Sequence, residues 1–164
     1  MAHAKYIVAD LLSVDADVLV NSANRSLLAG SGVCGQIFTV AGKQQLEAEC
    51  LRILQDRGVR FLGDGTSVMT GAYNLPFQAI IHSITPKNHV GDITKVYDCY
   101  HSAMQLAIAN GYQSIVFPLL GTGVNNIPAE YSGEQAIRAV DAVGDILTVY
   151  FCSRDASLVE LFRG

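Results

Sequence analysis

The feature that most constrains the fold of this chain is a regular alternation of short apolar segments with longer amphipathic ones. Short runs rich in β-branched and aliphatic residues, bounded by Asp, Asn, Gly or Pro, are typical of strands, whereas longer runs that end in glycine are typical of helices. The pattern predicts strands at residues 5–9, 17–23, 66–70, 78–84, 113–120 and 145–152. It predicts helices at residues 33–57, with a break near Gly42, and at 94–110, 128–143 and 155–162.

This order of elements predicts the fold class. Strands that alternate with helices form a mostly parallel sheet with helices packed on both faces. A chain of 164 residues, 50% of them hydrophobic, has enough apolar material for one domain with a sizeable core, which we place at residues 1–164. We therefore expect an α/β protein, a three-layer α/β/α sandwich around a central mixed, mostly parallel sheet. Its ligand is expected at the carboxyl ends of the strands.

Charge, cysteines and histidines exclude several classes of function. The formal net charge is -4 and the chain has no block of basic residues, so we expect no binding to duplex nucleic acid. The cysteines form no CxxC pair and the histidines show no metal-ligand spacing, so we expect no metal site, no cofactor and no disulfide framework. No apolar run approaches the ~18 residues that span a bilayer. We expect a reduced, cytoplasmic, monomeric protein that does not bind membranes.

Two glycine-rich segments follow predicted strands. Gly30–Gly35 fits the pattern G-x-G-x-x-G, but Gly30 follows its strand by a full loop, and Glu47 and Glu49 fall within a predicted helix. This placement does not fit a dinucleotide-binding fingerprint. Gly121–Gly123 follows another strand, and neither segment has the Lys of an ATPase P-loop. The segments are either ordinary turns or two facing rows of backbone N–H groups that suit a diphosphate.

Several polar side chains near these strand ends have two interpretations each. Asp10 either caps a turn or accepts a hydrogen bond from a donor such as an adenine amino group. Asn21 and Asn24 either satisfy loop backbone or, for Asn24, bind a ribose hydroxyl through an amide that donates and accepts. Cys34 is either a small buried residue or, at a helix N-terminus, partly a thiolate, and no His lies near it in sequence. His82, inside a strand, is interpreted as a hydrogen-bonded core residue rather than a base.

Four of these segments together resemble one protein family. The motifs, in the order and spacing of that family, are VNSAN at 20–24, GSGVC at 30–34, IIHS at 80–83 and PLLGTGV at 118–124. They resemble the macrodomain, an ADP-ribose-binding module, and the resemblance covers nearly the whole chain. Cys34 and the LLGTGV loop are most similar to the macrodomains, or X domains, of positive-strand RNA virus replicase polyproteins, whereas cellular hydrolases of the family usually carry Asp in place of Cys34. This likeness implies a viral nonstructural protein in the host cytoplasm.

The resemblance implies where ADP-ribose would bind. Asp10 and Leu11 would bind adenine, and Asn24 would bind the distal ribose, which is the ribose farther from adenine. The implied ligand contacts are Asp10, Leu11, Asn21, Asn24, Gly30, Ser31, Gly32, Val33, Leu120, Gly121, Thr122, Gly123, Val124, Asn125, Cys152, Ser153 and Arg154. The same resemblance places Asn24, Gly32 and Cys34 in the catalytic part of the site.

The resemblance also implies a reaction, the hydrolysis of mono-ADP-ribose from modified Asp or Glu side chains of proteins. A water held by the ligand phosphate and Asn24 would attack the anomeric carbon, so no strong protein base would be required. The chain departs from the family pattern at Asn125, where an aromatic residue usually covers the distal ribose. The alternatives are a reader that binds ADP-ribose or poly(ADP-ribose) without turnover, and a weak phosphatase acting on ADP-ribose 1''-phosphate. The implied partners are ADP-ribose and mono-ADP-ribosylated proteins.

Overall fold

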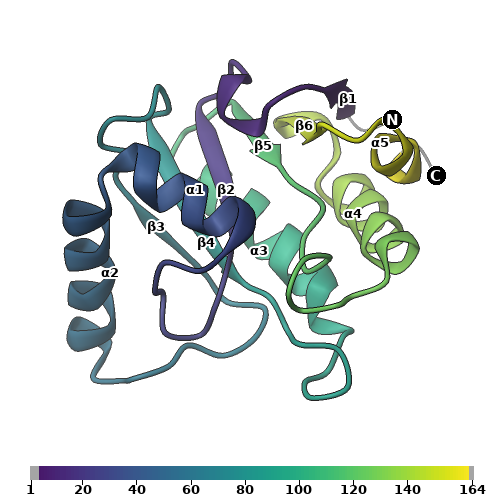
Figure 1. Ribbon diagram of the computed structural model, residues 1–164. Helices are drawn as coiled ribbons and strands as arrows, with labels where there is room; N and C mark the ends of the chain where they lie inside the picture. The colour runs from purple at the N-terminus through teal and green to yellow at the C-terminus, as the bar shows by residue number, and fades with distance from the viewer. Residues whose placement is uncertain (1–3, 163–164) are drawn as a thin grey trace.

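The computed structural model describes residues 4–162, and a six-stranded sheet lies at the centre of this part of the chain (Figure 1). The strands are β1 (Ala4–Val8), β2 (Val18–Ala23), β3 (Ser67–Thr70), β4 (Ala79–Ile84), β5 (Ser114–Phe117) and β6 (Thr148–Ser153). Their order across the sheet is β1-β6-β5-β2-β4-β3. Neighbouring strands run parallel, apart from the antiparallel pair β3 and β4. The expectation of a mixed, mostly parallel sheet is confirmed.

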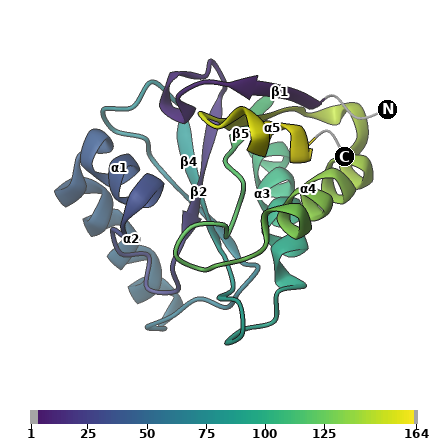
Figure 2. The ribbon, with the colours of Figure 1, turned by 45° about the vertical axis from the view of Figure 1, so that its right-hand side comes forward.

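Helices cover both faces of the sheet (Figure 2). On one face lie α1 (Gly32–Ala41) and α2 (Lys43–Arg57), and on the other lie α3 (Lys95–Ala109) and α4 (Ala129–Val143). The short α5 (Ala156–Phe162) packs against β1, β6 and α4. Two 3-10 turns, η1 (Leu11–Ser13) and η2 (Gly144–Ile146), complete the described elements. Within residues 4–162 no helix is both long and apolar enough to cross a membrane. The three-layer architecture is the one predicted.

Strand β2 separates two hydrophobic cores, because side chains alternate between the two faces of a sheet. Val18 and Val20 pack on the face covered by α3 and α4, whereas Leu19 packs on the face covered by α1 and α2. All three side chains are fully buried. A strand buried on both faces reads as a continuous apolar run, and this explains the unbroken hydrophobic sequence that leads into Asn21.

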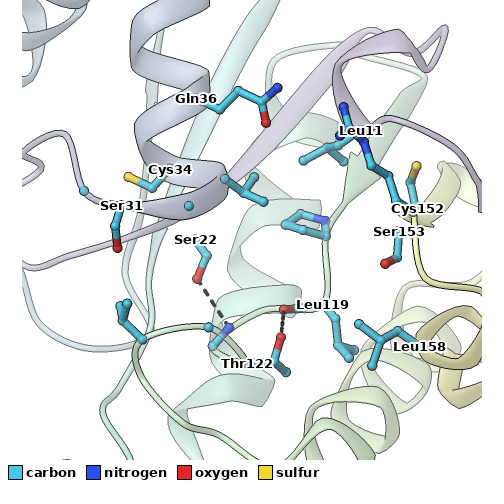
Figure 3. Close-up of a pocket in the computed structure, with 18 of the residues that line it drawn as sticks. Leu11, Ser22, Ser31, Cys34, Gln36, Leu119, Thr122, Cys152, Ser153 and Leu158 are labelled. Carbon is cyan, nitrogen blue, oxygen red and sulfur yellow. Dashed lines mark hydrogen bonds between the residues drawn. The ribbon is translucent and has the colours of Figure 1, made fainter.

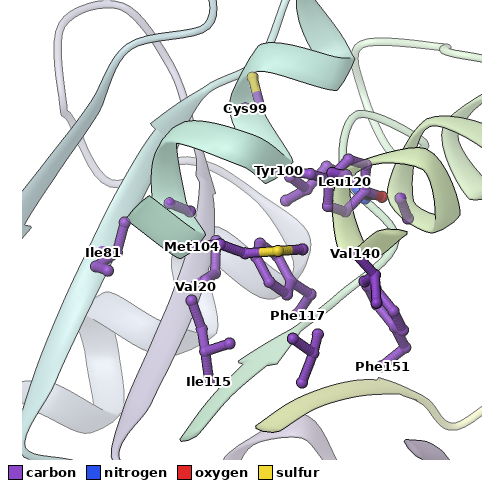
Figure 4. Close-up of a cluster of buried hydrophobic side chains, with 14 of the residues drawn as sticks. Val20, Ile81, Cys99, Tyr100, Met104, Ile115, Phe117, Leu120, Val140 and Phe151 are labelled. Atoms are coloured by element: carbon purple, nitrogen blue, oxygen red, sulfur yellow. Dashed lines mark hydrogen bonds between the residues drawn. The ribbon is translucent and has the colours of Figure 1, made fainter. Parts of the chain in front are cut away.

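A buried aromatic cluster anchors the loop that follows β5 (Figure 4). The ring of Tyr100 lies 5.3 Å from that of Phe117, centroid to centroid. The Tyr100 hydroxyl accepts a hydrogen bond from the Leu120 N–H at 2.8 Å and lies 2.8 Å from the hydroxyl of Ser132, which donates to the Leu120 carbonyl at 2.6 Å. Both polar backbone groups of Leu120 are therefore bound inside the core.

Two predicted strands differ from the observed ones. The strand expected at 113–120 is shortened to β5, because Gln113 donates its N–H to Asp17 Oδ2 at 2.8 Å and because Pro118 has no N–H for a ladder. The strand expected at 145–152 begins later, at Thr148 of β6, because Gly144–Ile146 form η2, in which Gly144 has φ +77°. The predicted helix break is confirmed, because Gly42 adopts φ +117° between α1 and α2.

The imidazole of His82 joins three strands inside the core. Its Nδ1 accepts a hydrogen bond from Asn21 Nδ2 at 3.1 Å, and its Nε2 donates to the Thr70 hydroxyl at 2.9 Å. Thr70 in turn donates to the Gly71 carbonyl at 3.0 Å, which assigns the neutral Nε2–H tautomer. Burial lowers the pKa of His82 to about 4. The interpretation of His82 as a hydrogen-bonded core residue is confirmed.

This buried, neutral histidine predicts that the free energy of unfolding falls as the pH drops from neutral toward 4. The unfolded chain, with an ordinary histidine pKa of about 6.5, binds more protons in this range than the folded protein, and the pKa difference corresponds to about 3 kcal/mol. Urea unfolding at neutral pH and near pH 5 measures the effect. The variant His82→Gln should lose this part of the pH dependence, whereas His101→Gln should keep it. Equal pH dependence in the parent and in His82→Gln would contradict the assignment.

Candidate ligand site

A cavity of about 490 Å³ runs along the carboxyl edge of the sheet. Its size falls within the range of ~300–1,000 Å³ that is usual for small-molecule sites. Figure 3 shows Ser31, Cys34 and Gln36 on one wall and Leu119 and Thr122 on the opposite wall. The cavity extends from β1 to β2, three strand intervals or about 14 Å at ~4.8 Å each, so it is elongated. We call the part lined by residues 9–12, 152–155 and 158 the β1 end, and the part lined by residues 22–24 and 125 the β2 end.

At the β1 end the carboxylate of Asp10 is held in place from two sides. Its Oδ1 accepts a hydrogen bond from the Leu12 N–H at 3.1 Å, and its Oδ2 lies 2.9 Å from Nη2 of Arg154. The Leu12 hydrogen bond, and then Arg154, hold the pKa of Asp10 below its usual value of 3.8. An ionised carboxylate has more lone pairs than these two contacts use. Asp10 therefore caps η1, one of its two interpretations, and keeps the acceptor capacity that the other requires.

The first glycine loop, residues 30–35, brings the start of α1 to the cavity. The N–H groups of residues 32–34 lie in the first turn of α1, where a helix gives them no internal acceptor. Gly32 has φ +58°, and a side chain built there would meet no described atom within 4 Å. A side chain at Gly35 would instead collide with the Gly30 carbonyl oxygen. The loop thus presents donors and a positive helix end to the cavity, which suits an anion.

The second glycine loop lies on the opposite wall and is tied to the end of β2. Gly121 has φ +81°, and a side chain there would come within 2.7 Å of Ile127 Cγ1, so the position requires glycine. The Gly121 N–H donates to the Ser22 hydroxyl at 3.3 Å, and the Thr122 hydroxyl donates to the Leu119 carbonyl at 3.0 Å (Figure 3). These bonds set the loop in a fixed position across the cavity from the first one.

The amide of Asn24 closes the loop that leads from β2 to the first glycine loop. Its Nδ2 donates to the Leu28 carbonyl at 2.8 Å, and its Oδ1 accepts from the Leu28 N–H at 3.0 Å. The guanidinium of Arg25 holds the same loop through two bonds to Asp64, at 3.0 and 2.8 Å. Asn24 therefore satisfies loop backbone, as one interpretation predicted. It also lines the cavity, with a second amide hydrogen and a second lone pair left over.

Most of the residues expected to contact a ligand line this one cavity. Asn21 and Leu120 do not. Asn21 points into the core on the α1–α2 face, where it is 1% exposed and bonded to His82. Leu120 is fully buried in the core on the α3–α4 face. The cavity is lined by the expected residues Asp10, Leu11, Asn24, Gly30, Ser31, Gly32, Val33, Cys34, Gly121, Thr122, Gly123, Val124, Asn125, Cys152, Ser153 and Arg154.

Sequence reasoning missed other residues of the wall. These are Ala9, Leu12, Ser22, Ala23, Gln36, Pro118, Leu119, Asp155 and Leu158. Most of them are sequence neighbours of an expected contact near a strand end. Their position next to a strand end is therefore the sequence feature that could have identified them. Gln36 and Leu158 lie inside helices, where the sequence contains no such signal.

The polar groups of the cavity are unevenly distributed. Among the lining residues that the structure describes, the charged side chains are Asp10, Arg154 and Asp155, all at the β1 end, and none of the lining residues is aromatic or a histidine. The Cys34 sulfur lies 3.9 Å from the Leu28 carbonyl oxygen. Across residues 4–162, His, Cys, Asp and Glu side chains form no group of three that could hold a metal ion. The β2 end therefore offers neutral donors and acceptors to a ligand.

Comparison with known proteins identifies the family. The family profile described as "Macro domain" matches residues 20–136, a stretch that contains most of β2 and both glycine loops. The chain belongs to the macro domain family. This macrodomain is 42% identical to an O-acetyl-ADP-ribose deacetylase of Klebsiella pneumoniae over 139 residues, which are 83% of this chain and 78% of that protein. It is 37% identical to the O-acetyl-ADP-ribose deacetylase of an Enterobacter species over 169 residues, covering 96% of this chain and 89% of that protein.

Solved structures confirm the macrodomain fold. The Oceanobacillus iheyensis macrodomain with ADP superposes with a TM-score of 0.86 at 29% identity, covering 95% of this chain and 85% of that one. The Trypanosoma brucei macrodomain in complex with ADP-ribose superposes with a TM-score of 0.82 at 26% identity, covering 98% of this chain and 67% of that one.

The comparisons correct one expectation. The two O-acetyl-ADP-ribose deacetylases named above are bacterial, and they do not support the viral replicase origin, or the host cytoplasm, that Cys34 and the LLGTGV loop implied. The likeness has a physical source in the loops themselves. Gly121 of the LLGTGV loop adopts φ +81°, so the turn itself requires this glycine, and the residue does not indicate a lineage.

Proposed function

We propose that this macrodomain binds ADP-ribose along the cavity, with adenine at the β1 end and the distal ribose at the β2 end. The observation that carries the proposal is the order of chemical groups along the cavity. An ionised Asp10 would repel phosphates but accepts a hydrogen bond from an adenine amino group. The glycine loops in the middle offer backbone N–H groups to a diphosphate. The amides of Asn24 and Asn125 at the β2 end suit ribose hydroxyls.

We propose further that the protein hydrolyses an acyl ester on the distal ribose. The first candidate substrate is O-acetyl-ADP-ribose, for which the bacterial relatives are named. Water adds to the ester carbonyl carbon, the bond from that carbon to the ribose oxygen breaks, and acetate and ADP-ribose are released. Asn24 orients the reacting groups by hydrogen bonds. The ligand diphosphate assists the water, because the charged side chains of the described cavity wall lie at the β1 end.

A protein-linked ester is the second candidate substrate. Val33 and Val124 line the cavity and are 46% and 77% exposed, so the cavity opens to solvent at both glycine loops and leaves room for an attached protein. ADP-ribose joined to an Asp or Glu side chain is also an acyl ester of the distal ribose. Here the water, held by the diphosphate and Asn24, attacks the anomeric carbon and releases an intact carboxylate. Mono-ADP-ribosylated proteins, and the ends of poly(ADP-ribose), are the proposed macromolecular partners.

Both substrates are tested by turnover in water enriched in the heavy oxygen isotope. Attack at an ester carbonyl places the label in the released carboxylate, whereas attack at the anomeric carbon places it in ADP-ribose. We expect labelled acetate from O-acetyl-ADP-ribose and labelled ADP-ribose from a mono-ADP-ribosylated protein. Tight binding of ADP-ribose with no release from either substrate would make the protein a reader. Phosphate release from ADP-ribose 1''-phosphate in the same assay would support a phosphatase.

The proposed orientation predicts the effect of removing the Asp10 carboxylate. Asp10→Ala should weaken ADP-ribose binding by about tenfold or more, the scale for losing a hydrogen bond to a charged group. Discrimination against GDP-ribose should also weaken, because guanine has a carbonyl where adenine has its amino group. Calorimetric titration of the parent and the variant with both ligands measures this.

A matched control separates the effect of the Asp10 hydrogen bond from the effect of negative charge at the β1 end. Asp155→Asn removes a second carboxylate there but keeps a side-chain acceptor for the Ser157 N–H, so it should bind like the parent. Arg154→Ala should raise the pKa of Asp10 toward its usual value. As the pH is lowered, the variant should therefore lose its affinity for ADP-ribose at a higher pH than the parent does, because Asp10 is protonated earlier. Unchanged affinity in Asp10→Ala would show that adenine lies elsewhere.

A further inference from the structure

Asn125, at the position where the family usually has an aromatic ring, carries an amide that the fold holds in one orientation. Its Nδ2 donates to the Thr85 carbonyl at 3.1 Å and to the Thr85 hydroxyl at 2.8 Å. The backbone carbonyl of Asn125 accepts a hydrogen bond from the Asn88 N–H at 2.9 Å. Nδ2 thus has two acceptors on Thr85, and within residues 4–162 Oδ1 has no hydrogen-bond partner.

The residue that holds this amide is itself fixed. Thr85 is 4% exposed, its N–H donates to the Ala23 carbonyl at 3.2 Å, and its hydroxyl lies 3.1 Å from that of Ser22. A reversed amide would place Oδ1 of Asn125 against the Thr85 carbonyl, two acceptors facing each other, so the bonding network assigns the oxygen to the other side. Because Asn125 lines the cavity, Oδ1 is the side-chain atom left to a ligand.

The same contacts place Asn125 beside the end of β2, which leads into Asn24. Thr85 is bonded to Ala23, and Asn24 follows Ala23 directly in the chain. Two amides from distant parts of the sequence, Asn24 and Asn125, therefore line one end of the cavity. Asn24 is engaged with the Leu28 backbone through both its oxygen and its nitrogen, whereas the oxygen of Asn125 is uncommitted.

We propose that Oδ1 of Asn125 accepts a hydrogen bond from a hydroxyl of the distal ribose and so selects ligands that carry this sugar. The inference rests on the proposed function, because it takes the distal ribose to lie at the β2 end. An oriented acceptor replaces the stacking contact that an aromatic ring would supply. A ligand that carries the distal ribose gains this hydrogen bond, whereas a ligand that lacks this sugar does not.

The experiment compares ADP-ribose with ADP, which lacks the distal ribose, in calorimetric titrations of the full chain. The parent should bind ADP-ribose more tightly than ADP. Asn125→Leu, close in size but without polar atoms, should bind ADP-ribose about three- to tenfold more weakly, the range for one lost neutral hydrogen bond, and should bind ADP unchanged. Asn125→Ala should do the same. Asn126→Gly, which removes the neighbouring amide and tolerates φ +57°, should match the parent for both ligands.

The outcomes separate the possible roles of Asn125. Equal weakening of ADP-ribose and ADP in both Asn125 variants would show that the residue supports the loop and does not bind ribose, and this would overturn the inference while leaving the proposed function intact. Unchanged binding of both ligands would overturn it as well. A parent protein that binds neither ligand would contradict the proposed function itself, and with it this inference. Thermal unfolding of each variant confirms that the fold is kept.

Discussion

Gly32→Glu should abolish ADP-ribose binding, with an affinity loss of at least about 100-fold, while the domain stays folded. A side chain at Gly32 meets no described atom within 4 Å, so the new carboxylate extends into the cavity, next to the N–H groups of α1. There it competes with the diphosphate for these donors and repels it; 100-fold corresponds to about 2.7 kcal/mol. The left-handed backbone at φ +58° adds strain of ~1–2 kcal/mol, which a stable domain tolerates. Calorimetric titration and thermal unfolding measure both effects.

The chain offers a matched control for this substitution. Gly58 ends α2, has φ +66°, and likewise has nothing within 4 Å of a built side chain, but it does not line the cavity. Gly58→Glu should therefore suffer similar backbone strain and still bind ADP-ribose like the parent. Lys43→Ala should also bind normally, because backbone N–H groups and not lysines hold the diphosphate in this account. A Gly32→Glu protein that binds like the parent, or a Lys43→Ala protein that does not bind, would contradict the two-loop cradle.

Asn24→Ala should lower the turnover number by about 100-fold, the scale for losing one oriented hydrogen-bond donor near the reacting atoms. Affinity for ADP should change far less, because the adenosine and the diphosphate bind elsewhere along the cavity. An interaction that strengthens in the transition state affects kcat more than ligand binding. Steady-state kinetics on O-acetyl-ADP-ribose, with calorimetry on ADP, separates the two quantities.

Asn24 also has a structural role, and a control variant must separate this role from contact with the reacting groups. The amide also pins Leu28, so its removal loosens the loop between β2 and α1. Arg25→Ala loosens the same loop by breaking the two bonds to Asp64, without removing a group that lines the cavity. We expect Arg25→Ala to keep most of the turnover. If both variants lose kcat equally, Asn24 acts by holding the loop and not by contacting the reacting groups.

The parts of the fold that could be predicted are those with a local sequence signal. The helix break at Gly42 and the end of α2 at Gly58 depend on left-handed backbone, and glycine marks both in the sequence. The glycine loops could be placed at strand ends for the same reason. Asn125 differs, because its role depends on Thr85, a residue 40 positions earlier that reaches it only through the fold. Such a long-range bond leaves no local pattern.

Two sequence-based expectations differ from the structure, the strand at 113–120 and the ligand contact of Asn21, and both differences have local physical causes. The apolar run that ends at Leu120 resembles one long strand, but Pro118 interrupts it. Leu120 donates a hydrogen bond to Tyr100 and accepts one from Ser132, and these bonds hold it in the core. The family resemblance implies a ligand contact for Asn21, which belongs to the VNSAN motif. Side chains alternate along β2, so Asn21 lies on the α1–α2 face and bonds His82. Sequence motifs located the edge of the sheet, and side-chain direction decided which residues face the cavity.

The initial rate of acetate release from O-acetyl-ADP-ribose, measured for the parent protein and for Gly32→Glu, tests whether this cavity is the site of the reaction. We expect turnover by the parent, competitive inhibition by ADP-ribose, and no turnover by Gly32→Glu, because one cavity binds the ligand and hydrolyses its ester. The Gly58→Glu control should turn over like the parent. No acetate release by a parent protein that binds ADP-ribose, or release that persists in Gly32→Glu, would contradict the claim that this cavity is the site of the reaction.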